Sequence, residues 1–145
     1  MLGGRSQTKA KRERQAKAAQ QIVIDRFGAN AGTAPRIICG DLNDYIDGSE
    51  GISAVTGWNQ VENVLDWLPN AADRWTHFFD TKNEYRQLDY ILASSSLAAS
   101  SSAVPEVVRK GLTKKAAQYT GPRFPDVTKT KEASDHCLLV WEATL

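Results

Sequence analysis

One stretch of the sequence decides the fold: RIICGDLN, residues 36–43. It opens on a β-branched and apolar run, which predicts a short buried strand. A glycine ends the run, and Asp41 and Asn43 follow directly. Open α/β sheets bind their ligands just outside the carboxyl ends of their strands. The stretch therefore predicts a strand with a candidate site at its end.

Two further polar clusters adjoin apolar runs. Asp89 stands alone within LDYIL, residues 88–92, and His136 closes SDH, residues 134–136, ahead of the run CLLVW. A carboxylate inside an apolar strand is costly unless it is paired or coordinates a metal ion. We therefore expect a partner for Asp89, either His136 or a cation. An aspartate that accepts from one ring nitrogen fixes the tautomer of a histidine and stabilises its charged form.

The segment ahead of the first strand predicts a basic amphipathic helix over residues 6–27. It is rich in Ala, Gln, Lys and Arg, and glycine at position 28 favours a C-cap. The basic side chains could lie near nucleic acid phosphates, and a solvated helical face is the alternative interpretation. The expected apolar face consists of Ala16, Ala19, Ile22, Val23 and Phe27.

The rest of the chain predicts short elements joined by loops. Residues 75–79 and 87–92 indicate two strands of a hairpin, and His77, in the first of them, is interpreted as structural. The other expected elements are one or two short helices in 49–68, a loop or short helix in 94–102, an edge strand at 104–108, a long surface loop over 110–131 and a final apolar strand.

The composition is that of a single globular domain. The chain has 145 residues, of which 41% are apolar and 24% charged, with a formal net charge of +1; these values exclude a disordered or fibrous chain. Since there is neither an apolar run of the roughly 18 to 20 residues that a membrane span needs nor the apolar core of a signal peptide, we expect no membrane partner. Cys39 and Cys137 match no zinc spacing and are interpreted as buried structural thiols.

The three polar clusters also carry a resemblance. GDLN at 40–43, LDYIL at 88–92 and SDH at 134–136 resemble the last three signature motifs of the endonuclease/exonuclease/phosphatase family, in the family's order. Members of that family hydrolyse phosphate esters with a divalent metal, usually Mg²⁺. The resemblance implies Mg²⁺ as the cofactor, with Mn²⁺ also acceptable to oxygen ligands.

The resemblance assigns a role to each residue by its position in the motifs. It implies that Asp41 orients or deprotonates the attacking water and contributes to the metal site, and that Asn43 binds the phosphate and the transition state. Asp135 corresponds to a metal-side carboxylate. His136 corresponds to the histidine that contacts the phosphate, and Asp89 to the carboxylate that orients it.

The resemblance covers nearly all of this chain and about half of the family's domain. We therefore expect an α/β (α+β) chain forming half of a four-layer α/β/β/α sandwich, with one mainly antiparallel sheet and outer helices. It would be a single partial domain over residues 1–145, with the basic helix at 6–27 and the motif-bearing sheet at 36–145. An asparagine, a metal-binding glutamate and a histidine or tyrosine of the family's N-terminal half have no counterpart before Asp41. An exposed inner sheet face favours a homodimer or a complementing N-terminal half.

The leading functional hypothesis is a divalent-metal-dependent phosphodiester hydrolase, a nuclease acting on DNA. The basic helix and the loop over 109–131 favour a nucleic acid partner because both could attract a phosphate backbone. The alternatives are a non-catalytic fragment or binding module that keeps the scaffold, and a small-molecule phosphatase. The motifs also have structural interpretations: a turn for Asp41 and Asn43, a satisfied strand carboxylate for Asp89 and a core histidine for His136.

Overall fold

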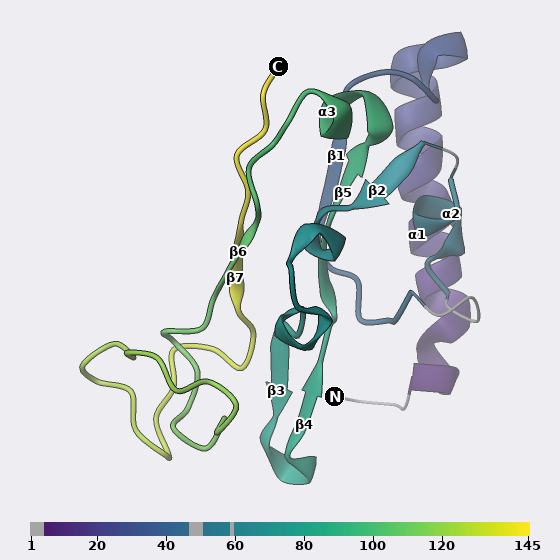
Figure 1. Cartoon of the computed structure of the whole chain (residues 1–145). Helices are drawn as coiled ribbons and strands as arrows, with labels where there is room; N and C mark the ends of the chain where they lie inside the picture. The colour runs from purple at the N-terminus through teal and green to yellow at the C-terminus, as the bar shows by residue number, and fades with distance from the viewer. Residues whose placement is uncertain (1–4, 47–50, 59) are drawn as a thin grey trace.

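The computed structural model describes residues 5–46, 51–58 and 60–145, and shows a mixed α/β chain (Figure 1). Its helices are α1 (Arg5–Phe27), α2 (Ser53–Thr56) and α3 (Ser95–Ala99), with 3-10 turns at Gly28–Asn30, Val64–Trp67, Ala71–Asp73 and Asp80–Lys82. Its strands are β1 (Ile37–Asp41), β2 (Val61–Asn63), β3 (His77–Phe79), β4 (Glu84–Arg86), β5 (Asp89–Ser94), β6 (Glu106–Val108) and β7 (Leu138–Val140). Within the described residues, no helix combines the length and the apolar character needed to cross a bilayer.

The strands pair antiparallel, as expected, but in three small sheets rather than one. These have the orders β1-β5-β2, β3-β4 and β6-β7. Thr76 explains the break between β4 and β5, because its hydroxyl accepts hydrogen bonds from the backbone N–H groups of both Leu88 and Asp89. An isolated bridge between His77 and His136 links β3 to the segment before β7.

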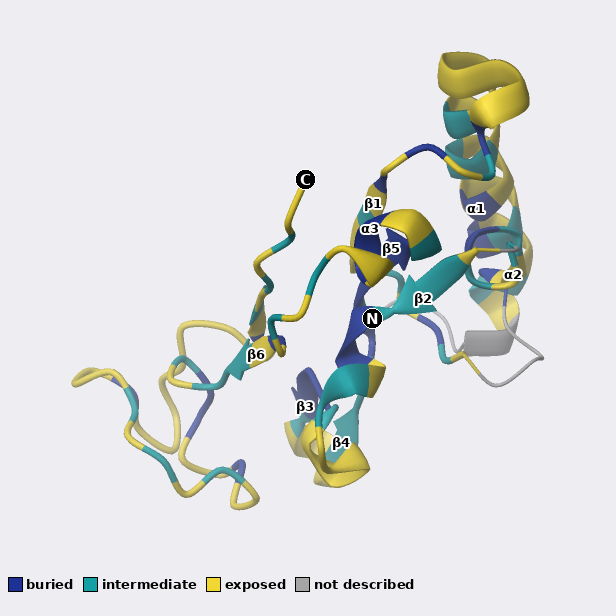
Figure 2. Ribbon diagram, turned by 45° about the horizontal axis from the view of Figure 1, so that its top comes forward, coloured by how far each residue is buried: buried dark blue, intermediate teal, exposed yellow. Residues whose placement is uncertain are grey.

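Strand β5 lies at the centre of the fold, with apolar side chains on both of its faces. Tyr90 and Leu92 point toward α1 and α2, where they form a cluster with Ala16, Ile52 and Val55. Ile91 and Ala93 point to the opposite face, where they pack with Val64, Trp67, Leu139 and Trp141. Figure 2 shows β5 as a buried strand with α1 and α2 on one side and β6 on the other. A third cluster, formed by Trp75, Phe78, Leu112, Ala116 and Cys137, anchors the predicted surface loop to β3.

Helix α1 confirms the predicted helix, but only part of its predicted apolar face is buried. Ala16 is buried and Ala19 packs beside it, whereas Ile22 is 68% exposed and Phe27 is also exposed. The last turns of α1 extend past the sheet and are largely exposed (Figure 2). Gly28 has a φ of 53°, the left-handed conformation expected of a helix-ending glycine.

The remaining predictions are confirmed in part. Helix α2 and the 3-10 turn at Val64–Trp67 lie in the predicted 49–68 region, of which residues 49, 50 and 59 lie outside the described residues. Strand β2 was not predicted there, because three half-buried residues carry no periodic signal. The predicted hairpin is wrong in its pairing: β3 forms a hairpin with β4, at the end of the predicted turn, whereas the predicted second strand is β5, which pairs with β1 and β2. The edge strand is present as β6, which starts directly after Pro105.

Apolar side chains on β1 and β7 remain open to solvent. Because side chains alternate along a strand, Ile38 packs toward α1 while Ile37 and Cys39 are exposed on the other face. On β7, Leu138 and Val140 are exposed in the same way. The prediction that Cys39 is buried is therefore wrong and that for Cys137 is confirmed. The expected self-association or complementation stays a prediction.

A buried ion pair joins α1 to the end of the first motif. Arg12 donates from Nε to Oδ2 of Asp44 at 2.8 Å, and the Asp44 side chain is only 1% exposed. The same carboxylate accepts from the backbone N–H groups of Gly51 and Tyr45, at 2.8 and 3.0 Å. The Tyr90 hydroxyl donates to the carbonyl oxygen of Asp44 at 2.9 Å. Asp44 thus ties the helix, the motif segment and β5 together.

We expect the substitution Asp44→Ala to lower the free energy of unfolding by roughly 3 to 5 kcal/mol, because removing one partner leaves a buried charge uncompensated. Urea unfolding followed by circular dichroism measures the change. Asp66→Ala is the matched control, since its ion pair with Arg74 is largely exposed and should contribute about 1 kcal/mol or less. Equal losses in the two variants would contradict the anchoring role of Asp44.

Candidate active site

The candidate site centres on a hydrogen bond between His136 and Asp89. The Nδ1 atom of His136 lies 2.8 Å from Oδ2 of Asp89, and both side chains are largely buried. Asp89 begins β5, where Thr76 fixes its backbone N–H. The backbone N–H of His136 donates to the Ser134 hydroxyl, which shapes the turn that carries the histidine. The partner that the sequence required for Asp89 is therefore His136.

The first motif reaches the same place through the register of β1 and β5. Asp41 lies directly opposite Asp89 in the antiparallel ladder, and its Oδ2 is 4.0 Å from Nε2 of His136. The backbone N–H of Asn43 donates to Oδ1 of Asp41 at 2.9 Å, and its side-chain amide donates to Oδ2 at 2.7 Å. Asn43 has a left-handed φ of 53° and Gly40 a φ of 141°, so the chain turns sharply at this point. The turn interpretation is thus correct for these residues, and it is this turn that presents them to His136.

Asp135 and His77 occupy the other side of His136. Oδ2 of Asp135 lies 3.5 Å from Nε2 of His77, and the rings of the two histidines have centroids 4.5 Å apart. His77 is 3% exposed, whereas the Asp135 side chain is 59% exposed. The sequence analysis interpreted His77 as structural. A histidine inside the predicted strand at 75–79, directly before the predicted strand that carries Asp89, was the available signal, but pairing with residue 136 is not visible in a local pattern.

Electrostatics set the two histidines apart. Burial is the largest influence on the pKa of His136 and lowers it, but the hydrogen bond to Asp89 and the charges of Asp89, Asp41 and Asp135 together outweigh burial, so the pKa of His136 is raised. Burial lowers the pKa of His77, and the neighbouring charge of His136 lowers it further. Relative to a free histidine, the site therefore favours the protonated form of His136 and the neutral form of His77.

Two overlapping groups of side chains could hold a metal ion. One consists of Asp41, Asp89 and His136, and the other of His77, Asp135 and His136; in each, one ligand atom per residue lies within 4.8 Å of the others. The two aspartates expected to share a metal, Asp41 and Asp135, fall into different groups that meet at His136. Five side chains from β1, β3, β5 and the segment before β7 thus gather around one imidazole.

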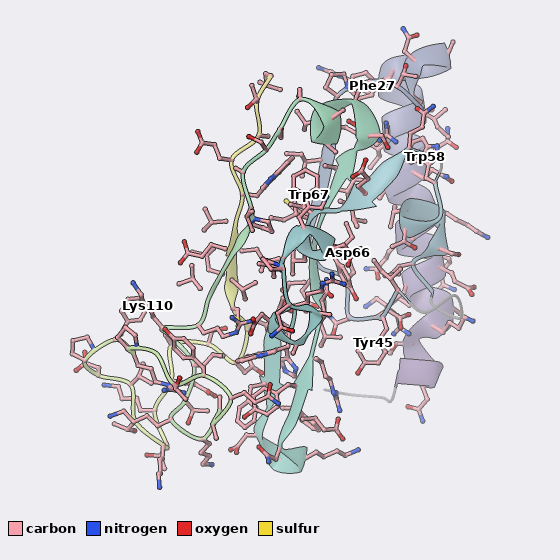
Figure 3. The ribbon with its side chains drawn as sticks, viewed as in Figure 1. Phe27, Tyr45, Trp58, Asp66, Trp67 and Lys110 are labelled. Atoms are coloured by element: carbon pink, nitrogen blue, oxygen red, sulfur yellow. The ribbon has the colours of Figure 1, made fainter. Side chains whose placement is uncertain are left out.

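The basic and aromatic residues outside the cluster have mostly structural contacts. Arg109 lies over the Trp75 ring and donates to the Trp75 carbonyl oxygen, and Arg123 donates to the backbone of Leu112. Neither guanidinium is therefore available as a simple surface charge. The exposed lysines of the loop are Lys110, Lys114, Lys115, Lys129 and Lys131. Figure 3 shows Lys110 on the loop and Trp67 in the layer between β2 and the β6–β7 ladder.

A histidine held by one carboxylate and facing a second, near the ends of antiparallel strands, is an arrangement that can transfer protons, as acid–base groups of hydrolases do. The chain belongs to the Endonuclease/Exonuclease/phosphatase family, whose model matches residues 5–136. All three motifs lie within the matched residues. Neither the comparison with curated proteins nor that with solved structures found a match. The family is one of phosphoesterase hydrolases, so the chain has a phosphoesterase scaffold with a possible His/Asp metal site.

We expect the two histidines to titrate on opposite sides of 6.5, the ordinary pKa of the side chain, with His136 above and His77 below. The chain contains only these two histidines, so nuclear magnetic resonance of the imidazole nitrogens, in EDTA, resolves both. Asp89→Asn should lower the pKa of His136, while Asp126→Asn, in the surface loop, should leave it unchanged.

The same pair should make stability depend on pH. A raised pKa means that the folded state binds the His136 proton more tightly, so the stabilisation is complete below pH 6.5 and is lost as the pH rises through the folded pKa. Asp89→Asn should therefore cost roughly 1.5 to 3 kcal/mol in acid and less in alkali, as expected for a hydrogen bond to a charged group. A loss that does not vary with pH would contradict the charged pair.

Proposed function

We propose that this chain carries the site of a divalent-metal-dependent phosphodiester hydrolase, a nuclease acting on DNA. The proposal is supported above all by the Asp89–His136 pair with Asp41 facing the second ring nitrogen. We further propose that the chain corresponds to the part of the family domain that carries the last three motifs, half of the α/β/β/α sandwich. The order of those motifs along the sequence supports this assignment.

His136 and Asn43 are suited to bind the phosphoryl group. Because Nδ1 of His136 is hydrogen-bonded to Asp89, Nε2 is the nitrogen left for a phosphoryl oxygen, and the raised pKa of His136 favours the protonated form in which Nε2 donates. Asn43 donates one side-chain N–H to Asp41, and its second side-chain N–H can donate to another acceptor. Preorganised donors aimed at phosphoryl oxygens stabilise the charge that develops in the transition state.

Asp41 is suited to orient a water for attack on phosphorus. Its two oxygens are fixed by Asn43, and about a third of its side chain remains exposed to solvent. A carboxylate held in this way can accept a hydrogen bond from the nucleophilic water and take up its proton. The geometry thus separates the role of Asp41, at the nucleophile, from that of His136, at the phosphoryl oxygens.

The carboxylates fit a hard divalent cation such as Mg²⁺ or Mn²⁺. Mg²⁺ commonly binds one or two carboxylates and keeps several waters and substrate phosphate oxygens. Asp135 offers an exposed carboxylate for this purpose, with Asp41 on the other side of His136. When bound, such a cation neutralises the charge on the phosphoryl oxygens.

A polyanionic substrate is supported by the surface charges. Besides the buried Arg12, helix α1 carries five basic residues that are described as exposed or half-exposed, among them Lys9, Lys11 and Lys17, and the loop adds its exposed lysines. Lysine side chains near a phosphate backbone raise affinity by releasing counterions. The loss of Arg109 and Arg123 to structural contacts leaves lysines as the DNA contacts of the loop.

The test is nicking of supercoiled plasmid DNA by the purified chain with Mg²⁺ or Mn²⁺. We expect activity that EDTA abolishes and that His136→Ala and Asp41→Ala each reduce by about 10² to 10⁴-fold, the usual worth of an acid–base group. Asp66→Asn, which alters an exposed carboxylate outside the cluster, should retain wild-type activity.

Other outcomes distinguish the alternatives. A folded, metal-saturated chain that binds DNA without cleaving it would favour the non-catalytic binding module. Hydrolysis of p-nitrophenyl phosphate with no action on DNA would favour a small-molecule phosphatase. Nicking that survives in both variants would arise from a contaminant or from another site, and would overturn the assignment of Asp41 and His136.

A further inference from the structure

His77 has an environment that packing alone does not explain. It is 3% exposed, and its Nδ1 atom is buried without a hydrogen-bond partner among the described residues. Its Nε2 atom lies 3.5 Å from Asp135, at the outer limit of a hydrogen bond. Buried polar atoms in folded proteins are nearly always satisfied, and an unsatisfied one costs about 1 to 3 kcal/mol. Because Nε2 faces Asp135 without a close hydrogen bond, it is the ring nitrogen available to a ligand shared with that carboxylate.

The neighbours of His77 supply the rest of a metal-binding set. Its ring lies 4.5 Å from that of His136, and ligand atoms of His77, Asp135 and His136 all lie within 4.8 Å of one another. The backbone holds this geometry, because Phe78 donates its N–H to the carbonyl oxygen of Asp135 at 3.0 Å and residues 77 and 136 form a β-bridge. The backbone therefore brings the three side chains together, and side-chain adjustment would bring their ligand atoms to the roughly 2.0 to 2.2 Å that Zn²⁺ requires.

Asp89 adds the outer contact that metal-bound histidines usually have. A histidine that coordinates through one ring nitrogen almost always donates the other N–H to a carboxylate, a carbonyl oxygen or a water, which fixes the ring and raises its basicity. Nδ1 of His136 makes this contact with Asp89 at 2.8 Å, which leaves Nε2 to coordinate. The Asp89–His136 pair is thus already set for metal binding.

We propose that His77, Asp135 and His136 form a binding site for a borderline transition-metal ion of the Zn²⁺ class, which shares Asp135 with the proposed carboxylate Mg²⁺ site but has two imidazoles as its other ligands. Two imidazoles and one carboxylate suit Zn²⁺, Co²⁺ or Ni²⁺, whereas Mg²⁺ selects oxygen ligands. Three protein ligands with a fourth position left for water are the usual set of an open zinc site. The inference does not depend on hydrolysis, and its test uses no substrate.

The experiment titrates the ¹⁵N-labelled full chain with ZnCl₂ and observes the imidazole nitrogens. A Cys39→Ser background removes the exposed thiol, which could bind zinc on its own. We expect saturation at one equivalent, with one ring nitrogen of each of the two histidines shifting together. Replacement of Zn²⁺ by Co²⁺ should give visible absorption bands, and excess Mg²⁺ should not displace the ion.

Calorimetry with Zn²⁺ then identifies the ligands. His77→Phe keeps an aromatic ring in the buried position, and Asp135→Asn changes an exposed side chain. If the His77→Phe variant does not fold, the Asp135→Asn variant still tests the proposal. Each should weaken affinity by at least about tenfold, and Asp89→Asn by about 10 to 100-fold through the outer contact. Asp41→Asn removes a nearby charge but no ligand of this site, and should weaken affinity less than Asp135→Asn does.

Three results would overturn the proposal. These are the absence of saturable Zn²⁺ binding, a titration in which only His136 shifts, and an Asp41→Asn variant that loses as much affinity as folded Asp135→Asn. The last two would assign zinc to the group of Asp41, Asp89 and His136. Because none of these measurements requires DNA, a chain that fails to nick plasmid can still pass, and a working nuclease can still fail.

Discussion

The buried carboxylate of Asp44 is the constraint on which the rest of the structure depends. The carboxylate accepts hydrogen bonds from Arg12 of α1 and from the backbone N–H of Gly51. The backbone carbonyl oxygen of Asp44 accepts a hydrogen bond from the Tyr90 hydroxyl on β5. A charge at this depth is tolerated only when its oxygens are satisfied. Helix, motif segment and central strand must therefore come together as a unit. The end of β1, three residues upstream, is fixed in consequence.

The register between β1 and β5 then brings the residues of the candidate site together. Asp41 and Asp89 lie opposite each other in the β1–β5 ladder, an arrangement that is unfavourable for two like charges. His136 relieves it, since its two ring nitrogens face the two carboxylates at 4.0 and 2.8 Å. A shift of the β1–β5 register by one residue would turn the side chains of one strand to the opposite face and separate Asp41 from Asp89 and His136. The raised pKa of His136 is thus a consequence of strand register.

The sequence predicted what short-range rules determine. The strand at Ile37, the helix ahead of it and the need of Asp89 for a partner follow from local patterns and from the cost of a buried charge. The break in the sheet does not, because it depends on one hydroxyl, that of Thr76, which accepts two backbone N–H groups twelve and thirteen residues away. The sequence also predicted that Ile22 and Phe27 of α1 face the protein interior, but both are exposed. Periodicity predicts which face of a helix is apolar, but it does not predict how far the neighbouring sheet extends along the helix. His77 was missed for a related reason: its partner is 59 positions further along the chain.

The two histidines show how one cluster can present different donors to different ions. On the solvent side stand carboxylates, the oxygen donors suited to a hard cation that keeps its waters. On the buried side stands a neutral imidazole beside a second imidazole already oriented by a carboxylate, the donors suited to a softer ion. Asp135 and His136 belong to both sets, so an ion held by His77 would withdraw them from a phosphate ester. If both proposals hold, the softness of the available metal decides whether His136 binds an ion or a phosphoryl oxygen.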